Sequence, residues 1–319
     1  KSKMWLILAL ASMLICTFSE IFAKKHVLTD ENNGPVKLRI CSSVVVVLLV
    51  PLFYALGLSE SGLLPWEILK EHPAIILMTS CTFMCTFCLV LSFRFIGVTM
   101  ESAVSSTSAV FLFAGMLLVN LFFGKLEDIR GTLVPAKLLP IVIIILALFL
   151  LPNADGIGRD RSPNADKAAA RKRIVIGILI VLLSNFFDVS DSIIAAVLLT
   201  DTDVGVFDTI ISGALVSGFY SLLLYIGSWA KHKKPLHLLS RSNRYCFVYA
   251  ILSILCIVVS LIAYAYDAVS SAILWLSYPV LPIIASALIL KERYSKRQYL
   301  CIAVIIAASL VFCIADYLP

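Results

Sequence analysis

Apolar stretches about 20 residues long follow one another along almost the entire chain, separated by short polar turns. A helix needs about 20 residues to cross the roughly 30 Å of hydrocarbon in a bilayer. The chain is 61% hydrophobic and 14% charged, with a mean hydropathy of +0.99, whereas about a quarter of residues in soluble domains are charged. Long alternating strands of the outer-membrane barrel kind are not seen, so the pattern predicts an all-α integral membrane protein.

The apolar windows predict ten transmembrane helices in two groups of five. They cover residues 4–23, 38–57, 73–93, 100–123, 133–151, 174–195, 205–229, 245–265, 269–290 and 298–317. The first window has the look of a signal peptide, but its length and the following lysine pair favour a retained helix. The one long polar stretch, 152–173, is interpreted as a linker between a first unit at 1–151 and a second at 174–319.

Matches at one offset indicate that the two units are duplicates. The sequence AVSS begins at Ala103 and again at Ala268, an offset of 165 residues that also separates Glu127 from Glu292. The first and sixth windows agree at the same offset, in the pairs Leu14/Leu179, Ile15/Ile180, Ser19/Ser184 and Phe22/Phe187. Because five helices is an odd number, the second unit enters from the opposite side, which gives two inverted five-helix repeats.

Positive charges predict the orientation and the membrane. The odd-numbered loops hold most of the 26 Lys and Arg residues, so these loops are expected in the cytoplasm and both termini outside. We expect a multi-pass protein of the inner or plasma membrane, monomeric or homodimeric. A net charge of +6 does not argue for nucleic acid, and the expected partners are the bilayer and a small-molecule solute.

The nine cysteines lie almost all inside apolar windows and have neither metal-ligand spacing nor a disulfide framework. They are interpreted as buried free thiols. Cys81, Cys85 and Cys88 share one helix face, which leaves a metal-binding stripe as an alternative, although no histidine is near. Neither a metal nor a cofactor is expected.

Ionisable side chains inside the windows mark the candidate site, since charge within hydrocarbon is costly unless it faces a bundle interior or a cavity. Asp188 shares a helical face with Ser184 and Asp191. It is interpreted as a substrate-binding or proton-binding group, with a structural carboxylate as the alternative. The same two roles are open for Glu20, because it can pair with Lys24 four residues later.

Other polar residues have mainly structural interpretations. Glu101 and Asp267 begin corresponding helices, where an acidic side chain favours the helix dipole and capping. Asp191 is interpreted as a solvated helix end and Arg94 as an interfacial anchor. The charged segment 291–293 is expected to be a cytoplasmic turn.

The end of the chain resembles the terminal signature of the drug/metabolite transporter superfamily, of the EamA type, in the run WLSYPVLPIIASALILKERYSKRQYLCIAVIIAASLVF at 275–312. Shared features are a proline-containing helix, a Glu after an apolar run, a polar turn and a closing helix. SAVFLFAGMLLVNLFFGKLE, at 108–127, resembles the same signature but lacks the equivalent of Pro279. SEIFAKK at 19–25 and SNFFDVSD at 184–191 resemble the polar bend in the first helix of each family repeat.

This resemblance implies a ten-helix carrier with a central cavity built from the first, third and fourth helices of each repeat. Carried over to this sequence, it implies the substrate-binding residues Ser19, Glu20, Glu101, Asn185, Asp188, Tyr266 and Trp275. Asp188 and Glu20 are the candidates for proton coupling. These motifs indicate the superfamily but say almost nothing about which substrate is carried.

The balance of charge near the cavity predicts the class of solute. A polyanion such as a nucleotide sugar needs Arg or Lys clamps, and the cations counted near the helix interiors all lie toward helix ends: Lys24, Lys25, Arg94 and Lys137. A cationic or zwitterionic metabolite, such as an amino acid, an amine or a drug-like cation, is therefore favoured. Proton antiport follows if one of the two coupling carboxylates titrates.

Alternatives remain open at this stage. One is a carrier of an anionic nucleotide sugar or phosphorylated metabolite, and another is a membrane scaffold or lipid-handling protein without solute flux. A membrane-embedded enzyme is disfavoured, because the four histidines all fall in loops or at helix ends: His26, His72, His232 and His237.

Overall fold

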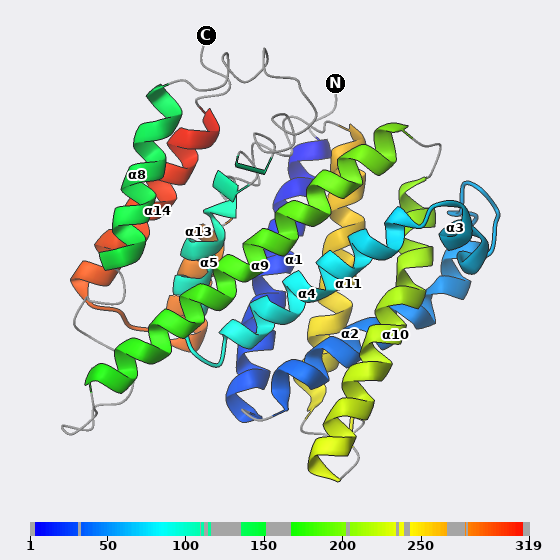
Figure 1. Ribbon diagram of the computed structural model, residues 1–319, viewed down its shortest axis with the longest axis horizontal. Coiled ribbons are helices and arrows are strands. Elements are labelled where there is room, and N and C mark those ends of the chain that lie inside the picture. Colours follow the sequence, from blue (N-terminus) through cyan, green and yellow to red (C-terminus); the bar gives the residue numbers. More distant parts are fainter. Residues whose placement is uncertain are drawn as a thin grey trace.

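The computed structural model describes residues 4–30, 33–108, 110–111, 114–115, 135–150, 167–201, 205–233, 236–238, 243–266, 278 and 280–314. Every regular element within those ranges is a helix (Figure 1). The expected all-α class is confirmed for this part of the chain. The helices lie side by side and are strongly tilted relative to one another.

The described part of the first half contains four long or medium helices and two short ones. Their bounds are α1 Met4–Thr29, α2 Gly34–Ala55, α3 Pro65–Glu71, α4 Ala74–Ser92, α5 Val98–Ser105 and α8 Pro135–Leu150. Helix α3 lies in a segment predicted to be a polar loop. It forms there because Pro65 suits a first helical turn and the Glu67 carboxylate accepts a hydrogen bond from the Leu64 amide at 2.8 Å.

The described part of the second half is helical as well. Its elements are α9 Lys167–Asp201, α10 Val206–His232, α11 Arg244–Tyr266, α13 Val280–Ala285, the π-helix η3 Ser286–Leu290 and α14 Lys296–Ile314. Helix α9 begins inside the segment interpreted as the linker, so residues 167–173 of that linker are helical. The rest of the linker lies outside the described residues.

Within the described ranges, five helices are long and apolar enough to cross a membrane: Met4–Thr29, Gly34–Ala55, Ala74–Ser92, Arg171–Ile194 and Phe207–Lys231. Leu139–Leu148, Arg244–Ser260 and Val280–Leu290 are shorter apolar helices. Large apolar side chains face outward along these helices, including Leu48 at 70% and Leu139 at 65% exposure. An outer surface so rich in apolar side chains suits lipid and not water, so the chain is a multi-pass membrane protein.

Helices from the two halves pack against each other throughout. The most extensive packing joins α1 to α11 and α4 to α9, followed by α8 with α14 and α2 with α10. One buried apolar cluster, which includes Met100, Ile178 and Ile305, joins α5, α9 and α14. A second, which includes Ile21, Leu38 and Tyr249, joins α1, α2 and α11. Both clusters therefore lie between the two halves, whereas a smaller one around Ile68 and Ile75 lies within the first half.

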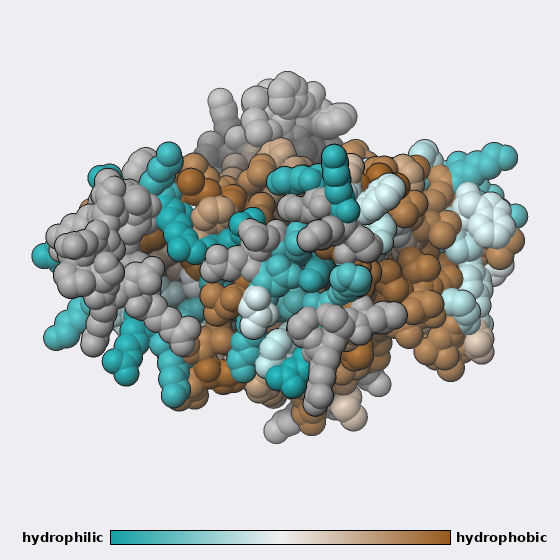
Figure 2. All heavy atoms as spheres, turned by 90° about the horizontal axis from the view of Figure 1, so that it is seen from below, coloured by the Kyte–Doolittle hydropathy of each residue, from teal (hydrophilic) through white to brown (hydrophobic). Residues whose placement is uncertain are grey.

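Hydrophilic side chains gather at the end of the bundle that lies lowest in Figure 1. Figure 2 looks onto that end and shows hydrophilic patches across it, with hydrophobic side chains around them. The α1–α2 turn and the end of α10 lie here. These connections belong to the odd-numbered loops predicted to face the cytoplasm.

Candidate functional site

Glu20 is a buried carboxylate near the middle of the bundle. It lies on α1 and is 8% exposed. The Tyr278 hydroxyl, which comes from the segment just before α13, donates to Glu20 Oε1 at 2.5 Å. Glu20 Oε2 is fully buried and has no hydrogen-bond partner. A buried carboxylate with half of its hydrogen-bonding capacity unused favours a proton or a cationic group beside it.

A second buried carboxylate, Glu101 on α5, lies close enough for its charge to act on Glu20. Its Oε1 accepts a hydrogen bond from the Ser105 hydroxyl at 2.6 Å, and Ser102 lies at 3.5 Å from Oε2. Helix α1 packs against both α5 and α13. Glu20, Glu101 and Tyr278 therefore come together from three elements, as expected if all three border one site.

Ser19 and Asn185 join helices of opposite halves. The Ser19 hydroxyl lies 2.8 Å from the Ser253 hydroxyl of α11. Asn185 Nδ2 donates to the Val104 carbonyl and to the Thr107 hydroxyl, both at 3.1 Å, and so connects α9 to α5. These contacts are consistent with helix packing, and a role in substrate binding stays a prediction for both residues.

Asp188 and Asp191 differ in their surroundings on α9. Ser184 is buried and donates to the Cys85 carbonyl at 2.8 Å, and Asp191 accepts from the Thr82 hydroxyl at 2.9 Å. This face therefore lies against α4, and the interpretation of Asp191 as a solvated helix end is wrong. Asp188 is exposed and makes no hydrogen bond to a described residue. Its substrate-binding and proton-coupling roles stay predictions.

Two predicted site residues fall where the structure does not describe side chains. Tyr266 is the last residue of α11, and its side chain is outside the described set. Trp275 lies outside the described residues.

Lys24 does not act as the partner of Glu20. It is buried on α1, and its ammonium donates to the backbone oxygens of Phe93 and, at 2.8 Å, Ile96. These carbonyls follow the end of α4, where a cation satisfies acceptors that the helix leaves open. The pairing proposed between Glu20 and Lys24 is therefore wrong, and Lys24 instead fixes α1 to the α4–α5 turn.

Arg39 is a buried cation that the sequence reasoning missed. Helix α2 already begins at Gly34, with Pro35 in its first turn, so Arg39 lies within the helix and not in a loop. It is 7% exposed, and its guanidinium carbon lies 4.2 Å from the centre of the Phe83 ring on α4. The signal in the sequence was the pair Ser42 and Ser43, which lies one helical turn after Arg39 and shows that the polar face continues into the apolar run. The assumption that cations stay away from the bundle interior is wrong at this position.

The start of α5 is capped from the other half of the chain. Glu292 accepts hydrogen bonds from the amides of Val98 at 3.0 Å and Thr99 at 3.2 Å, and Tyr294 donates to the same carboxylate at 3.0 Å. Burial, together with the charge of Glu292, raises the pKa of Tyr294 well above its ordinary value. The capping role expected of Glu101 therefore belongs to Glu292. Segment 291–293, which was expected to be only a turn, connects the second half to the start of α5.

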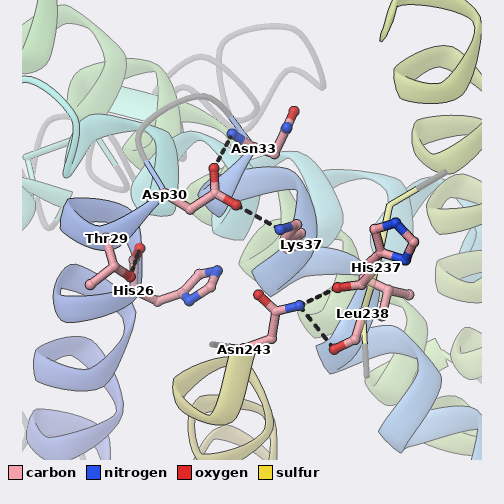
Figure 3. Close-up of polar contacts among 8 residues, drawn as sticks. All are labelled: His26, Thr29, Asp30, Asn33, Lys37, His237, Leu238 and Asn243. Atoms are coloured by element: carbon pink, nitrogen blue, oxygen red, sulfur yellow. Dashed lines mark hydrogen bonds and ion pairs between the residues drawn. The ribbon is translucent and has the colours of Figure 1, made fainter. Parts of the chain in front are cut away.

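The α1–α2 turn carries a second polar cluster (Figure 3). Asp30 accepts from the Lys37 ammonium at 2.7 Å and the Asn33 amide at 3.1 Å. Partial burial opposes the charge of Asp30, but these two hydrogen bonds outweigh it and lower the pKa of Asp30. The buried ring of His26 points into this region, and neither ring nitrogen has a hydrogen-bond partner.

Asn243 fixes the segment that precedes α11. Its Nδ2 donates to the carbonyl oxygens of His237 and, at 3.0 Å, Leu238 (Figure 3). His237 therefore contributes its backbone to this cluster and not a ring contact. The contacts in the figure stabilise connections at the end of the bundle and do not form a catalytic arrangement.

Among the described residues, no three His, Cys, Asp or Glu side chains are grouped so that they could hold a metal ion. Eight cysteines within the same ranges are free thiols, Cys81, Cys85 and Cys88 included. No model of a known protein family matches the chain, and no curated protein sequence does either. The transporter resemblance therefore stays a prediction from the residues that carry it.

Proposed function

We propose that this chain is a secondary carrier that moves a small cationic or zwitterionic metabolite across the cell membrane by alternating access. The observation that carries the proposal is Glu20, a carboxylate buried inside a membrane bundle with one oxygen held by Tyr278 and the other without a partner. Such a group is expensive to keep in an apolar interior unless it serves a solute or a proton.

The helix pairing supports the proposed ten-helix carrier with two inverted repeats. If α1, α2, α4, α5 and α8 correspond to α9, α10, α11, α13 and α14, exchanging the halves turns the α1–α11 contact into the α9–α4 contact. These are the two most extensive contacts, and the pairs α2–α10 and α8–α14 map onto themselves. Ser19 of α1 hydrogen-bonds to α11, and Ser184 of α9, 165 residues later, hydrogen-bonds to α4, which is the corresponding contact after the exchange. An exchange of contacts of this kind is expected of two repeats related by a pseudo-two-fold axis.

The charges near the site favour a solute with a positive group. Glu20 and Glu101 lie together and lack a described cationic partner. A single buried arginine, Arg39, does not provide the several cations that would clamp a nucleotide sugar or a phosphorylated metabolite. Proton coupling follows if a proton and the solute compete for Glu20.

Reconstitution in liposomes tests the proposal. Purified protein should drive uptake or release of at least one solute in a panel of amines and amino acids. Replacement of the buried carboxylate, Glu20→Gln, should reduce that flux at least about tenfold, because it removes a charge-assisted contact. The matched control is Glu71→Gln at an exposed position on α3, which should transport normally.

Folded protein that moves no solute in any direction across the panel would contradict the carrier function and favour the scaffold. Normal flux in the Glu20→Gln variant would reject the site while leaving the carrier in place. Thermal unfolding in detergent verifies that each variant is folded.

A further inference from the structure

Arg39 is a buried charge without an opposite charge. Among the described residues the one ion pair is Lys37 with Asp30, and Arg39 has no carboxylate within reach. Its single hydrogen bond, from Nη2 to the Ser217 hydroxyl of α10, is long at 3.4 Å. Its Nε is buried and has no partner at all. An arginine cannot relieve this situation by losing its proton at any ordinary pH.

The groups around Arg39 form a built site between three helices. Ser43 of α2 and Ser217 of α10 are both buried, and their hydroxyls lie 2.9 Å apart. Ser221, one turn further along α10, has a buried hydroxyl with no hydrogen-bond partner. Phe83 covers one face of the guanidinium and so leaves the N–H groups at its edge for a ligand. Arg39 Nε and the hydroxyl of Ser221, which lies four residues after Ser217 on α10, are both buried donors without a hydrogen-bond partner among the described residues.

We propose that Arg39, with Ser217 and Ser221, binds the carboxylate of the transported solute while Glu20 binds its cationic group. A guanidinium matches a carboxylate in shape and charge. One positive charge balances one negative charge, whereas a phosphate dianion would leave excess negative charge in an apolar interior. The solute is therefore a zwitterion with an amine and a carboxylate.

Helix α11 connects the elements that carry Arg39 and Glu20, and its Tyr249 is buried in the apolar cluster shared by α1, α2 and α11. Helix α11 packs against both α1 and α2, which carry those two residues. The assignment of the carboxylate to the solute rests on the proposed carrier function, but binding of a carboxylate at Arg39 does not.

Ligand-dependent thermal unfolding of the full chain in detergent tests the anion site. Sodium acetate should raise the melting temperature more than sodium chloride or sodium phosphate at equal ionic strength. Arg39→Gln should weaken the apparent affinity for acetate about 10- to 100-fold, as expected for a hydrogen-bonded charge pair. The control is Arg244→Gln, because Arg244 also lies over an aromatic ring, Tyr245, but is exposed.

Ser221→Ala provides a second test if Arg39→Gln does not fold. Loss of one hydroxyl hydrogen bond to the carboxylate, a charge-assisted contact, should weaken acetate binding about 10-fold. Equal stabilisation by all three salts, or an unchanged acetate response in a folded Arg39→Gln or Ser221→Ala variant, would overturn the site.

Solutes with both charges test the link to Glu20. In a ladder from glycine to 6-aminohexanoate, at least one member should stabilise the wild type more than acetate and the matching amine do separately. That advantage should disappear in Arg39→Gln while the response to the amine remains. No advantage at any chain length would overturn the two-ended arrangement. Acetate binding at Arg39 without any solute flux in liposomes would instead contradict the carrier function alone.

Discussion

At the scale of single residues, sequence reasoning located one buried charge and missed another. Glu20 could be found because a charged side chain within an apolar window is costly to bury. Arg39 was missed because it is the second residue of the window at 38–57 and was counted with the cations of the preceding loop. The partner of Glu20, Tyr278, lies 258 residues later in the chain, and no local pattern connects the two.

Gly97 shows how one residue controls a contact between the halves. A Cβ there would lie 2.0 Å from Tyr294 Oη and 2.5 Å from Glu292 Oε2. We expect Gly97→Ala to destabilise the protein by about 1–3 kcal/mol, because the displaced carboxylate would lose its contacts with α5. The measurement is thermal unfolding in detergent.

A second glycine provides the control. Gly227 lies within α10 and has no atom within 4 Å of its Cβ position. Gly227→Ala should stabilise by up to about 1 kcal/mol through helix propensity. Equal effects of the two substitutions would show that the space at Gly97 is not restricted as described.

At the scale of helices, the type of element was predictable but its ends were not. The apolar windows are mainly helical where the structure describes them, since a membrane leaves few other ways to satisfy the backbone. Ser106, Thr107 and Tyr278 are exceptions that lie in turns inside two of the windows. Helix α3 and the first turns of α9 were missed because they are polar, and hydropathy does not distinguish a polar helix from a loop. The π-helix η3 follows the buried Pro282, and hydropathy does not predict such a local change of helix type.

The cap on α5 makes a prediction at this scale. Glu292→Ala removes the acceptor for two first-turn amides, so we expect a loss of stability of about 1 kcal/mol. Arg293→Ala, at the exposed neighbouring position, should change stability little. Both are measured by thermal unfolding, and similar losses in the two variants would argue against capping by Glu292.

The α1–α2 turn predicts a dependence on pH. The pKa of Asp30 is lowered in the folded protein. The ionised carboxylate therefore contributes fully to folding stability above its unfolded pKa of about 4, and this stability is lost as the pH falls through the pKa of the folded state. Asp30→Asn should therefore lower stability by up to about 1 kcal/mol at pH 7. The difference from wild type should shrink below about pH 4.

Lys37→Gln should give the same loss as Asp30→Asn at neutral pH, since it removes the other half of the ion pair. Unfolding curves from pH 7 to pH 3 measure both variants. A difference between Asp30→Asn and wild type that stays constant down to pH 3 would contradict the role of the pair.

At the scale of the whole molecule, the partners of the helices could not be predicted from hydropathy. A helix that faces lipid on one side and another helix on the other is apolar all round, so its sequence does not say which neighbour it meets. The offset of 165 residues predicted a relation between the halves but no contacts. That α1 packs on α11 and α4 on α9 is information from the structure alone.

The proposed orientation can be measured with reporter fusions in a bacterial host. An alkaline phosphatase fused after residue 319 should be active and a fluorescent protein there dark, because the end of this chain is expected outside. The same reporters inserted at residue 160 should give the opposite result. Equal behaviour at the two sites would contradict five helices in the second half.

The packing of α1 against α11 also means that α1 must wait during biosynthesis until its partner helix has been made. Helix α1 leaves the ribosome first, but α11 does not begin until Arg244. At about 5–20 residues per second, synthesis of the intervening chain takes roughly ten to fifty seconds. During that interval Ser19 has no Ser253 to bind and Glu20 has no Tyr278. The nascent first helix must therefore be sheltered by the insertion machinery, or by lipid headgroups at the interface, until most of the protein has been made.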